Sequence, residues 1–456
     1  MACDEYHSVR REAGRRARDP DAAHLCVQPS RAMPRAMKRE DPPRPDPLPG
    51  PMSAGQRRSL SNRGGEILQY GEPDIAAALR AAFEAESDAA DEFTHGFHTY
   101  PARMHPGIAR SLIDTLSRPG ERILDPFCGS GTVLVEAMLA GRPACGVDLS
   151  PLAIRIAEVH CALRGPVERQ RFANTLARVT QASLERVRAR VRARAPLSLA
   201  ERALYEPHVL LELAGLFDEI RTVKPAADRR ALEVVFSALL IKFSKQRSET
   251  VAEQADKRIR KGLVSEFFER KGGELVQRWE ALFDAVGKRA KPPGLFVGDA
   301  RKLPTLLRIR GQRPVLGYDL VLTSPPYGGT YDYHAHHALR YPWLELDASG
   351  LLRDEVGARR WLSTKDGQEA DAAAARWERE LAACLASIAV MCNPGGGVVL
   401  LLGDAEVGGE RIDAFEQVMR IAPRAGLTLV AAAAQERRDY LGGANRREHL
   451  LFLRPL

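Results

Sequence analysis

A four-residue segment in the second half of the chain has residue types suited to holding a planar amine. Ser324-Pro325-Pro326-Tyr327 follows a strand-like apolar run at residues 318–323. Two consecutive prolines fix the backbone angle φ and lack amide hydrogens, so the nearby carbonyl oxygens keep their capacity to accept. The Ser324 hydroxyl and the Pro325 carbonyl can then accept the N–H bonds of an amine, while the Tyr327 ring offers a stacking face. The alternative interpretation is a rigid proline turn without a ligand.

A glycine-rich turn far upstream has the features of a cofactor loop. It reads DPFCGSGT at residues 125–132 and follows a short apolar run. Gly129 and Gly131 let a ligand approach the backbone where a Cβ atom would clash. The GxGxxG pattern of NAD-binding folds is absent, so nothing marks a pyrophosphate site. The turn therefore predicts a concavity for a different nucleoside-bearing cofactor.

Two further carboxylates stand at the ends of predicted strands. Asp148 ends the run at residues 143–148, and Asp299 ends the run at residues 294–299. A carboxylate at the end of the second strand can accept both hydroxyls of a ribose. We therefore expect Asp148 to bind a ribose and Asp299 to face an adenine amine. Either aspartate could instead cap a helix or a turn, although Ser150 offers an alternative cap beside Asp148.

The SPPY and FxGxG motifs together resemble those of the amino-methyltransferases of DNA. The resemblance covers residues 93–163 and 294–455. These enzymes move a methyl group from S-adenosylmethionine to an exocyclic nitrogen of a base that has been flipped out of the duplex. The resemblance implies S-adenosylmethionine as the cofactor, with the glycine turn wrapped around its methionine part. It makes Asp125 an acceptor for the cofactor ammonium group and includes Phe127 in the cofactor site.

The same resemblance implies that Ser324, Pro325, Pro326 and Tyr327 are the catalytic residues. Serine at the first position is commonest in cytosine-N4 enzymes, whereas Asp or Asn there is typical of adenine-N6 enzymes. We therefore expect a site-specific DNA methyltransferase that acts on N4 of cytosine. An adenine-N6 enzyme and an RNA base methyltransferase are the alternatives. A restriction–modification role follows from the family, and a partner nuclease is not readable from the sequence.

A segment upstream of the glycine turn, residues 97–106, resembles the one that covers the methionine end of the cofactor in many of these enzymes. Thr99 and Arg103 are the residues we expect to meet the cofactor carboxylate. The alternative is a proline-bounded loop that packs on the sheet.

The order of predicted elements indicates an α/β fold. Strands at residues 122–125 and 143–148 alternate with helices at 108–116, 133–140 and 151–163, which is the pattern of a parallel sheet covered on both faces. Further strands are predicted at residues 294–299, 320–323, 398–402, 427–432 and 449–453, the last two as a hairpin-like pair. We expect a doubly wound, seven-stranded, mostly parallel sheet of the Rossmann-like, class I methyltransferase type with a helical insertion.

Composition divides the chain into four parts. We expect a disordered, basic Pro/Arg-rich tail, a cofactor-binding half, a helical basic insertion and a catalytic half, at residues 1–65, 66–163, 164–290 and 291–456. The net charge is +8, and the insertion alone carries 26 Lys and Arg against 17 Asp and Glu. Cations concentrated outside the motif-bearing segments suggest a polyanionic partner. Solvated arginine-rich helices would give the same composition.

The expected partner is DNA, and specific residues are candidates for contacting it. Lys242, Lys245 and Arg247 cluster after an apolar helix at residues 234–243, where they can meet phosphates. Tyr331 and His334 follow the SPPY loop and are expected to line the base pocket or contact DNA. Because the insertion precedes the third predicted strand, at residues 294–299, its role in target recognition stays open.

Other classes of protein are disfavoured by the sequence. Three histidines at residues 334, 336 and 337 lack a carboxylate or thiol at ligand spacing, so we expect no metal there. The Pro-Cys motif of carbon-5 cytosine methyltransferases is absent, so Cys128 is expected to be a buried thiol. Seven scattered cysteines suit a reducing compartment, and no run approaches a membrane span. We therefore expect a cytoplasmic, nucleoid-associated protein without a membrane segment.

Overall fold

The computed structural model describes residues 63–85, 88–247, 254–255, 257–287, 290–307, 317–363, 367–437 and 446–456. The predicted disordered tail at residues 1–65 lies outside these ranges except for its last three residues. Those three residues begin a strand, β1 (Arg63–Gly71), so the predicted boundary at residue 65 is wrong. The folded part begins at least as early as Arg63.

One mixed sheet forms the centre of the part of the chain outside the insertion, in the order β1-β9-β10-β6-β5-β2-β3-β4. Its strands after β1 are β2 (Ile123–Asp125), β3 (Ala144–Asp148), β4 (Gly294–Val297), β5 (Tyr318–Thr323), β6 (Cys392–Gly403), β9 (Leu427–Arg437) and β10 (Arg446–Pro455). Strands β4, β3, β2, β5 and β6 run parallel, and β10 pairs antiparallel with both β6 and β9. The predicted α/β class with a mostly parallel sheet is therefore confirmed, but this sheet has eight strands and not seven.

The additional strand, β1, pairs antiparallel with β9 at the edge of the sheet. Its side chains Leu68 and Tyr70 are half-exposed. A one-sided edge strand with two adjacent glycines lacks the continuous apolar run that marks a buried strand, which explains why the sequence pattern missed it.

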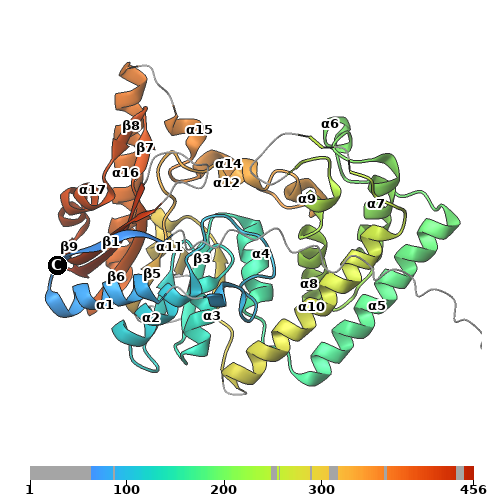
Figure 1. Ribbon diagram of the computed structural model, residues 1–456, viewed down its shortest axis with the longest axis horizontal. Coiled ribbons are helices and arrows are strands. Elements are labelled where there is room, and N and C mark those ends of the chain that lie inside the picture. Colours follow the sequence, from blue (N-terminus) through green and yellow to red (C-terminus); the bar gives the residue numbers. More distant parts are fainter. Residues whose placement is uncertain are drawn as a thin grey trace, which may run out of the picture. The chain divides into compact units, whose positions relative to one another are not determined.

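Alternating side chains of the parallel strands supply two separate cores. Val321 of β5 faces one core, whereas Leu320 and Leu322 face the other. The first core is covered by α11 (Leu303–Leu307), α16 (Gly367–Met391) and α17 (Ala414–Ile421). The second is covered by α1 (Pro73–Glu84), α2 (Pro106–Leu116) and α3 (Thr132–Leu139) (Figure 1). The period of two along a strand thus places a helical layer on each face.

The predicted helical insertion consists mainly of helices in the part that the structure describes, and its one isolated β-bridge there joins Gln246 and Gln254. It contains α5 (Pro166–Ala189), α6 (Leu199–Arg202), α7 (Pro207–Arg221), α8 (Ala226–Ser237), α9 (Leu240–Phe243) and α10 (Leu263–Val286), and follows α4 (Pro151–His160) (Figure 1). The apolar helix expected at residues 234–243 is interrupted between α8 and α9. The long helices of the insertion pack on one another through an apolar core of their own.

That core also takes in residues from the catalytic half. Trp343 is fully buried among Tyr205, Phe217 and Phe236 of the insertion. The Trp343 Nε1–H donates to the Tyr205 hydroxyl over 3.1 Å. The insertion and the segment after β5 therefore share one hydrophobic core.

Short elements connect β5 to β6 and decorate the end of β6. They are α12 (Tyr333–His336), α13 (Arg340–Trp343), α14 (Ser349–Asp354), α15 (Arg359–Leu362), β7 (Ala405–Val407) and β8 (Glu410–Ile412), with 3₁₀ turns η1 (Asp88–Asp91), η2 (Ala300–Lys302) and η3 (Ala422–Ala425) elsewhere. Among the helices of the described ranges, none is both long enough and apolar enough to cross a bilayer.

Candidate active site

The glycine turn and the SPPY loop meet at the point where the strand order reverses. Strands β2, β3 and β4 proceed to one side of the sheet, and β5 and β6 proceed to the other. Asp125 ends β2 and Thr323 ends the adjacent β5, and the Thr323 hydroxyl donates to Asp125 Oδ1 over 2.6 Å. A crevice outside the carboxyl ends of parallel strands at such a reversal is the usual ligand site of this fold. Thr323, which the sequence analysis did not select, connects the two motifs.

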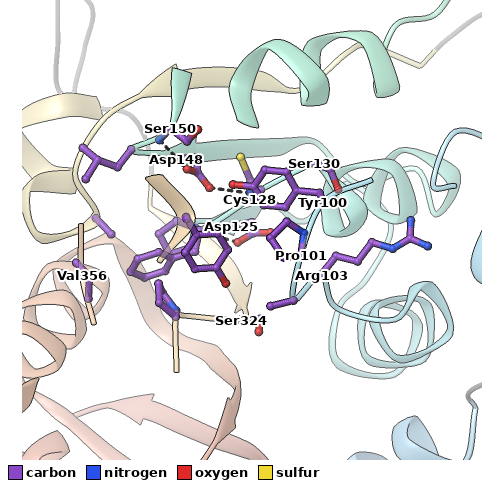
Figure 2. Close-up of a pocket in the computed structure, with 18 of the residues that line it drawn as sticks. Tyr100, Pro101, Arg103, Asp125, Cys128, Ser130, Asp148, Ser150, Ser324 and Val356 are labelled. Carbon is purple, nitrogen blue, oxygen red and sulfur yellow. Dashed lines mark hydrogen bonds between the residues drawn. The ribbon is translucent and has the colours of Figure 1, made fainter. Parts of the chain in front are cut away.

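An open cavity of about 810 Å³ lies at this position. Eight residues selected from the sequence line it, namely Arg103, Asp125, Phe127, Gly129, Asp148, Asp299, Ser324 and Pro326 (Figure 2). Four others, Thr99, Gly131, Pro325 and Tyr327, are not among its lining residues. Lining residues that the sequence analysis did not select include Tyr100, Met104, Tyr333, Leu351 and Glu355. The segments before and after the insertion therefore both contribute to one cavity.

The Asp125 carboxylate is buried and held in place from two sides. Its Oδ1 accepts from the Phe127 backbone N–H over 3.1 Å as well as from Thr323. Burial raises the pKa of Asp125 to about 7, although both hydrogen bonds act in the opposite direction. A carboxyl with this pKa gains a strong preference for ionisation once a cation lies beside it.

Asp148 accepts from the backbone on both sides of the cavity. Its Oδ2 accepts from the Gly129 N–H over 2.9 Å, and its Oδ1 accepts from the Ser150 N–H over 2.8 Å. Burial raises the pKa of Asp148 to about 6, and the negative charge of Glu355 adds to the increase. The helix cap of α4 is Ser150, whose hydroxyl accepts from the Ala153 N–H. Asp148 is therefore not the cap of α4, and each carboxylate oxygen keeps a second lone pair for a ligand hydroxyl.

Asp299 lines the cavity but also caps the turn η2. Its Oδ1 accepts from the Arg301 backbone N–H over 2.9 Å, and its carboxylate forms a two-point ion pair with the Arg301 guanidinium. Arg301 also donates to the Asp354 carbonyl over 2.8 Å. The capping role considered as the alternative for Asp299 is thus present, so a ligand amine must compete with Arg301 for this carboxylate.

The segment predicted to cover the methionine end does contribute to the cavity wall, but with partly different residues. Thr99 is exposed and lies outside the cavity lining. The Arg103 guanidinium donates to the carbonyls of Ala90 and His95, and it points away from Asp125 and Asp148 in Figure 2. The cavity is also lined here by Tyr100, Pro101 and Met104, among others. Arg103 is a lining residue too, but its guanidinium is bonded within the segment and is not directed at the two aspartates.

The two glycines of the FxGxG motif have different roles. Gly129 lines the cavity with φ of 48°, and a Cβ atom there would lie 3.0 Å from the Tyr100 ring. Gly131 has φ of 89° at the N-cap of α3, and a Cβ atom there would lie 3.2 Å from Ala157 Cβ. Gly129 therefore allows close approach at the cavity, whereas Gly131 allows the left-handed turn and the packing of α3 against α4.

The SPPY loop is held rigidly by the elements beneath it. A Cβ atom on Gly328 would lie 2.8 Å from the Trp377 ring of α16, and one on Gly329 would lie 1.9 Å from the Glu406 carbonyl of β7. The Tyr327 hydroxyl donates to Glu448 Oε1 over 3.0 Å. Burial holds the pKa of Tyr327 well above its ordinary value, so the hydroxyl stays protonated.

The Tyr327 ring packs close to β6, because a Cβ atom on Gly403 would lie 2.5 Å from it. This placement differs from the stacking face expected from the sequence. The anchoring partner, Glu448, is itself ion-paired with Arg437 over 2.6 Å. Tyr327 therefore acts here as an anchor for the loop through its hydroxyl and its ring.

The residues after the loop form a roof over the cavity, and one of them is a buried acid. Glu355 accepts from the backbone N–H groups of Tyr333 and His334 and pairs with Arg360 over 2.8 Å. Burial raises the pKa of Glu355, partly offset by Arg360 and Tyr333. The Tyr333 ring stacks on Tyr100 with a centroid separation of 6.2 Å. The roof thus joins the catalytic half to the segment before the glycine turn.

The residues predicted to contact nucleic acid are placed unevenly. Lys242 Nζ lies 3.9 Å from the centroid of the Phe267 ring, and Lys245 forms an ion pair with Glu206 over 3.3 Å. Arg247 also has an intramolecular partner. These cations are therefore partly engaged within the insertion.

The two aromatic candidates after the loop lie beside the roof. Tyr331 contacts Tyr333 at 5.7 Å between ring centroids, and His334 stacks on Tyr341 at 5.5 Å. Neither is among the cavity lining, whereas Tyr333 between them is. Cys128 lines the cavity, and burial holds the pKa of its thiol well above the ordinary value. The thiol is therefore protonated, as expected of a structural cysteine.

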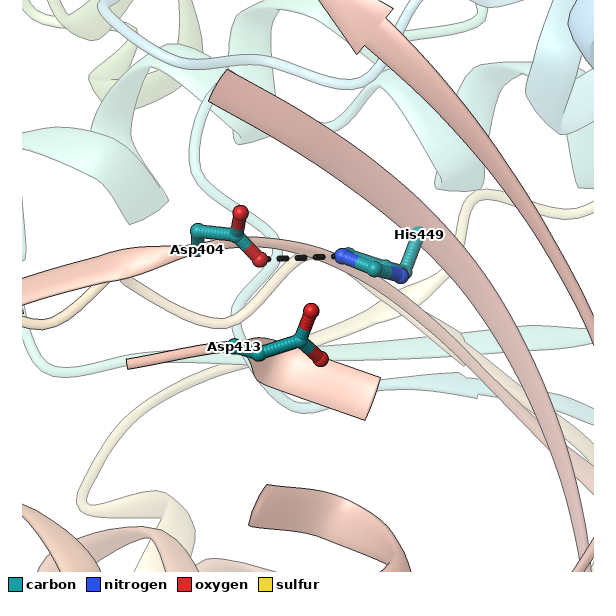
Figure 3. Close-up of side chains that lie close together, drawn as sticks. All are labelled: Asp404, Asp413 and His449. Carbon is teal, nitrogen blue, oxygen red and sulfur yellow. Dashed lines mark hydrogen bonds and ion pairs between the residues drawn. The ribbon is translucent and has the colours of Figure 1, made fainter. Parts of the chain in front are cut away.

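A second cluster of titratable groups lies at the end of β6, where Asp404, Asp413 and His449 converge (Figure 3). The two Asp404 oxygens accept from His449 Nε2 over 2.9 Å, from the Arg411 guanidinium, and from the backbone N–H groups of Ala414 and Arg447. Burial alone would raise the pKa of Asp404, but these hydrogen bonds outweigh it and lower the pKa to about 2. With protein donors at both oxygens, Asp404 fixes β6, β10 and α17 together, and its chemistry is that of a structural carboxylate.

Comparison with known proteins gives short but consistent matches. A family model described as DNA methylase matches residues 74–159, a segment that includes the glycine turn. The type II methyltransferase M.MvaI of Kocuria varians is 40% identical over 65 residues, which are 14% of this chain and 14% of that protein. A tRNA (guanine(10)-N2)-dimethyltransferase of Methanothermobacter thermautotrophicus is 45% identical over 51 residues, 11% of this chain and 15% of that protein. The chain thus matches about one seventh of the length of these relatives.

The resemblance to amino-methyltransferases that the motifs predicted is confirmed over residues 74–159. Among solved structures, the rRNA methyltransferase aviRa from Streptomyces viridochromogenes is 14% identical with a TM-score of 0.33, covering 82% of this chain and 96% of that one. A structural similarity this weak says nothing about function.

Proposed function

We propose that this chain transfers a methyl group from S-adenosylmethionine to the exocyclic amine of a base in DNA, with N4 of cytosine favoured. The observation that carries the proposal is the hydrogen bond between Thr323 and Asp125. It joins the strand that ends in the glycine turn to the strand that ends in SPPY, so that a cofactor and an amine can meet in one cavity.

The charge of the cavity supports S-adenosylmethionine as the cofactor. Among the residues that the structure describes, Asp125, Asp148, Asp299 and Glu355 are the acidic lining residues and Arg103 is the basic one. S-adenosylmethionine carries an ammonium and a sulfonium against one carboxylate, so its net positive charge suits such a cavity. When bound, it supplies an electrophilic methyl group. Asp125 would hold the ammonium group, and Asp148 would accept from the ribose hydroxyls.

The amine of a base is a weak nucleophile, because its lone pair is delocalised into the ring. Ser324 lines the cavity, and its hydroxyl can accept an N–H bond of the amine and so localise the lone pair on nitrogen. The Pro325 carbonyl is the second acceptor that we propose for the amine. The close packing of Gly328 and Gly329 holds the loop in place, which reduces the reorganisation needed at the moment of transfer. A base within a duplex cannot reach such a cavity, so the proposal includes base flipping.

The serine of the SPPY motif favours cytosine N4 over adenine N6, and the DNA methylase match favours DNA over RNA. The tRNA-modifying relative supports a second candidate, methylation of guanine N2 in RNA. Relatives named as type II methyltransferases support a role beside a restriction nuclease. A function on chromosomal DNA would place the protein with the nucleoid in the cytoplasm.

The test is a methyl-transfer assay with radiolabelled S-adenosylmethionine and, in parallel, duplex DNA and bulk tRNA. Acceptors that become labelled are digested to nucleosides and identified by mass spectrometry. Label in N4-methylcytosine supports the proposal, and label in N6-methyladenine changes the base but keeps the substrate class. Label confined to N2-methylguanosine of tRNA would replace the proposal with the second candidate.

A further inference from the structure

One tryptophan of this chain is exposed beside the SPPY loop. Of the four tryptophans, Trp279, Trp343 and Trp377 are at most 1% exposed, whereas Trp361 is 42% exposed. A single exposed apolar side chain is common on protein surfaces. The position of Trp361 is what distinguishes it, because three hydrogen bonds fix its helix between the catalytic loop and β7.

Trp361 belongs to α15, and the backbone around α15 is attached to the loop directly. The Arg359 N–H donates to the Tyr331 carbonyl over 2.9 Å, and the Gly329 N–H donates to the Gly357 carbonyl over 3.0 Å. On the other side, the Gly408 N–H donates to the Leu362 carbonyl over 2.9 Å. The Leu362 side chain is fully buried. Leu362 is buried in the core whereas Trp361 next to it is exposed, on a helix whose flanking backbone is hydrogen-bonded to the SPPY loop.

Arginines surround this ring. The guanidinium carbons of Arg360 and Arg376 lie 5.4 and 4.8 Å from the Trp361 ring centroid, which is cation–π distance. Their charges are already balanced, since Arg360 pairs with Asp332 and Arg376 pairs with Glu380. Arg359 is exposed and, within the described ranges, is without an ion pair. The surface around Trp361 therefore combines a stacking platform, held in position by neighbouring cations, with one cation available for a phosphate.

We propose that Trp361 stacks on a base of the DNA strand next to the target base, and that Arg359 contacts an adjacent phosphate. This inference rests on the proposed function and names the surface that would hold the DNA at the mouth of the cavity. An aromatic ring with an adjacent arginine is the arrangement that binds unstacked nucleic acid, because every base has a π-face and every linkage has a charge. Flipping the target base interrupts the stack of its neighbours, and Trp361 can replace the lost contact.

Two kinds of measurement test this surface on the purified full chain. Emission of Trp361 is separated from that of the buried tryptophans by comparing wild type with Trp361→Phe. Titration with a mixed-sequence 20-mer, single-stranded or duplex, should quench the part of the emission that Trp361→Phe lacks. Trp361→Ala should weaken DNA binding by about 5- to 150-fold, the equivalent of ~1–3 kcal/mol for one stacked base, and Trp361→Phe should retain most of the affinity.

Arg359→Ala gives an independent readout. Arg359→Ala should make the plot of log affinity against log salt concentration less steep by about 0.9 for duplex DNA, which is the value of one phosphate contact. Tyr70→Ala is the matched control, because Tyr70 is 53% exposed and lies on β1, and it should bind DNA like wild type. Thermal unfolding of each variant near the wild-type temperature shows that the fold is retained.

The outcomes separate this inference from the proposed function. If wild type and Trp361→Ala bind and methylate DNA equally well, and DNA does not quench the emission of Trp361, the stacking role is overturned and the proposed function still stands. Absence of both binding and methylation for DNA overturns both. Quenching by tRNA with no effect of DNA also overturns the assignment to DNA and points to the RNA substrate.

Discussion

Replacing Tyr327 with Phe separates two roles for the last residue of the SPPY loop. The substitution keeps the ring and removes only the hydroxyl that donates to Glu448 over 3.0 Å. If the ring serves as a stacking face, the variant should transfer methyl groups like wild type. If the hydroxyl anchors the loop that carries Ser324, the variant should be slower.

The size of the effect follows from the partner. A hydrogen bond to a charged acceptor contributes ~1.5–3 kcal/mol, and the lower end applies because Glu448 is 23% exposed. If most of that is lost in the transition state, kcat falls roughly tenfold, since ~1.4 kcal/mol corresponds to a factor of ten. Binding of S-adenosylmethionine should be unchanged, because Tyr327 does not line the cavity.

The assay is methyl transfer at saturating cofactor, with cofactor affinity measured separately by calorimetry. Tyr70→Phe is the control, since its hydroxyl belongs to a half-exposed ring that contacts Phe415 edge-on. A Tyr327→Phe enzyme with wild-type kcat would refute the anchoring argument. It would return the residue to the stacking role that the sequence suggested.

Four further outcomes follow from the structure. Ser324→Ala should lower kcat by ~2–4 kcal/mol of transition-state stabilisation while cofactor affinity stays the same, and full turnover in single-turnover kinetics would contradict it. Asp148→Ala should weaken S-adenosylmethionine about 10- to 100-fold with little change at saturating cofactor, for which wild-type affinity in calorimetry is the opposing result. Burial raises the pKa of Asp125 to about 7 and that of Asp148 to about 6, so both carboxyls are increasingly protonated below these values. Affinity for the cationic cofactor should therefore rise from about pH 5.5 to about pH 8. A flat profile of affinity against pH would contradict this expectation. Asp404→Asn should lower the free energy of unfolding by about 2 kcal/mol near pH 7, because the pKa of Asp404 is lowered to about 2 in the folded chain. This contribution is fully present above the ordinary pKa near 4 and is lost as pH falls towards 2. Unfolding curves of the variant that match those of wild type at every pH would contradict that role.

Local patterns were sufficient to predict the parts of this structure that depend on local physics. The apolar run before Asp125 and the glycine turn after it predict β2 and the start of α3 without any knowledge of neighbours. The carboxyl ends of parallel strands then bring Asp125, Asp148 and Ser324 to one cavity, as the topology requires.

The misses are residues whose roles are set by partners distant in sequence. Glu355 follows a short helix far from any motif, and nothing local marks it as part of the cavity wall. Tyr327 was assigned a free ring because its partner Glu448 lies more than a hundred residues later. Thr99 was chosen for its chemistry, but its neighbours Tyr100 and Met104 line the cavity and Thr99 does not. Asp299 is different, because the position expected for a ligand and the capping role considered as its alternative both occur in this one residue.

The position of Trp343 has a consequence for any attempt to exchange modules between enzymes of this kind. Its ring is inserted among Tyr205, Phe217 and Phe236, yet it belongs to the segment that continues to the cavity roof at Leu351 and Glu355. Removing residues 164–290, or replacing them with a different insertion, would expose the Trp343 ring. The segment that forms the cavity roof would then lose its packing against the insertion. A chimera that is to keep its cofactor site must therefore carry those three aromatic residues along with whatever new surface it is given.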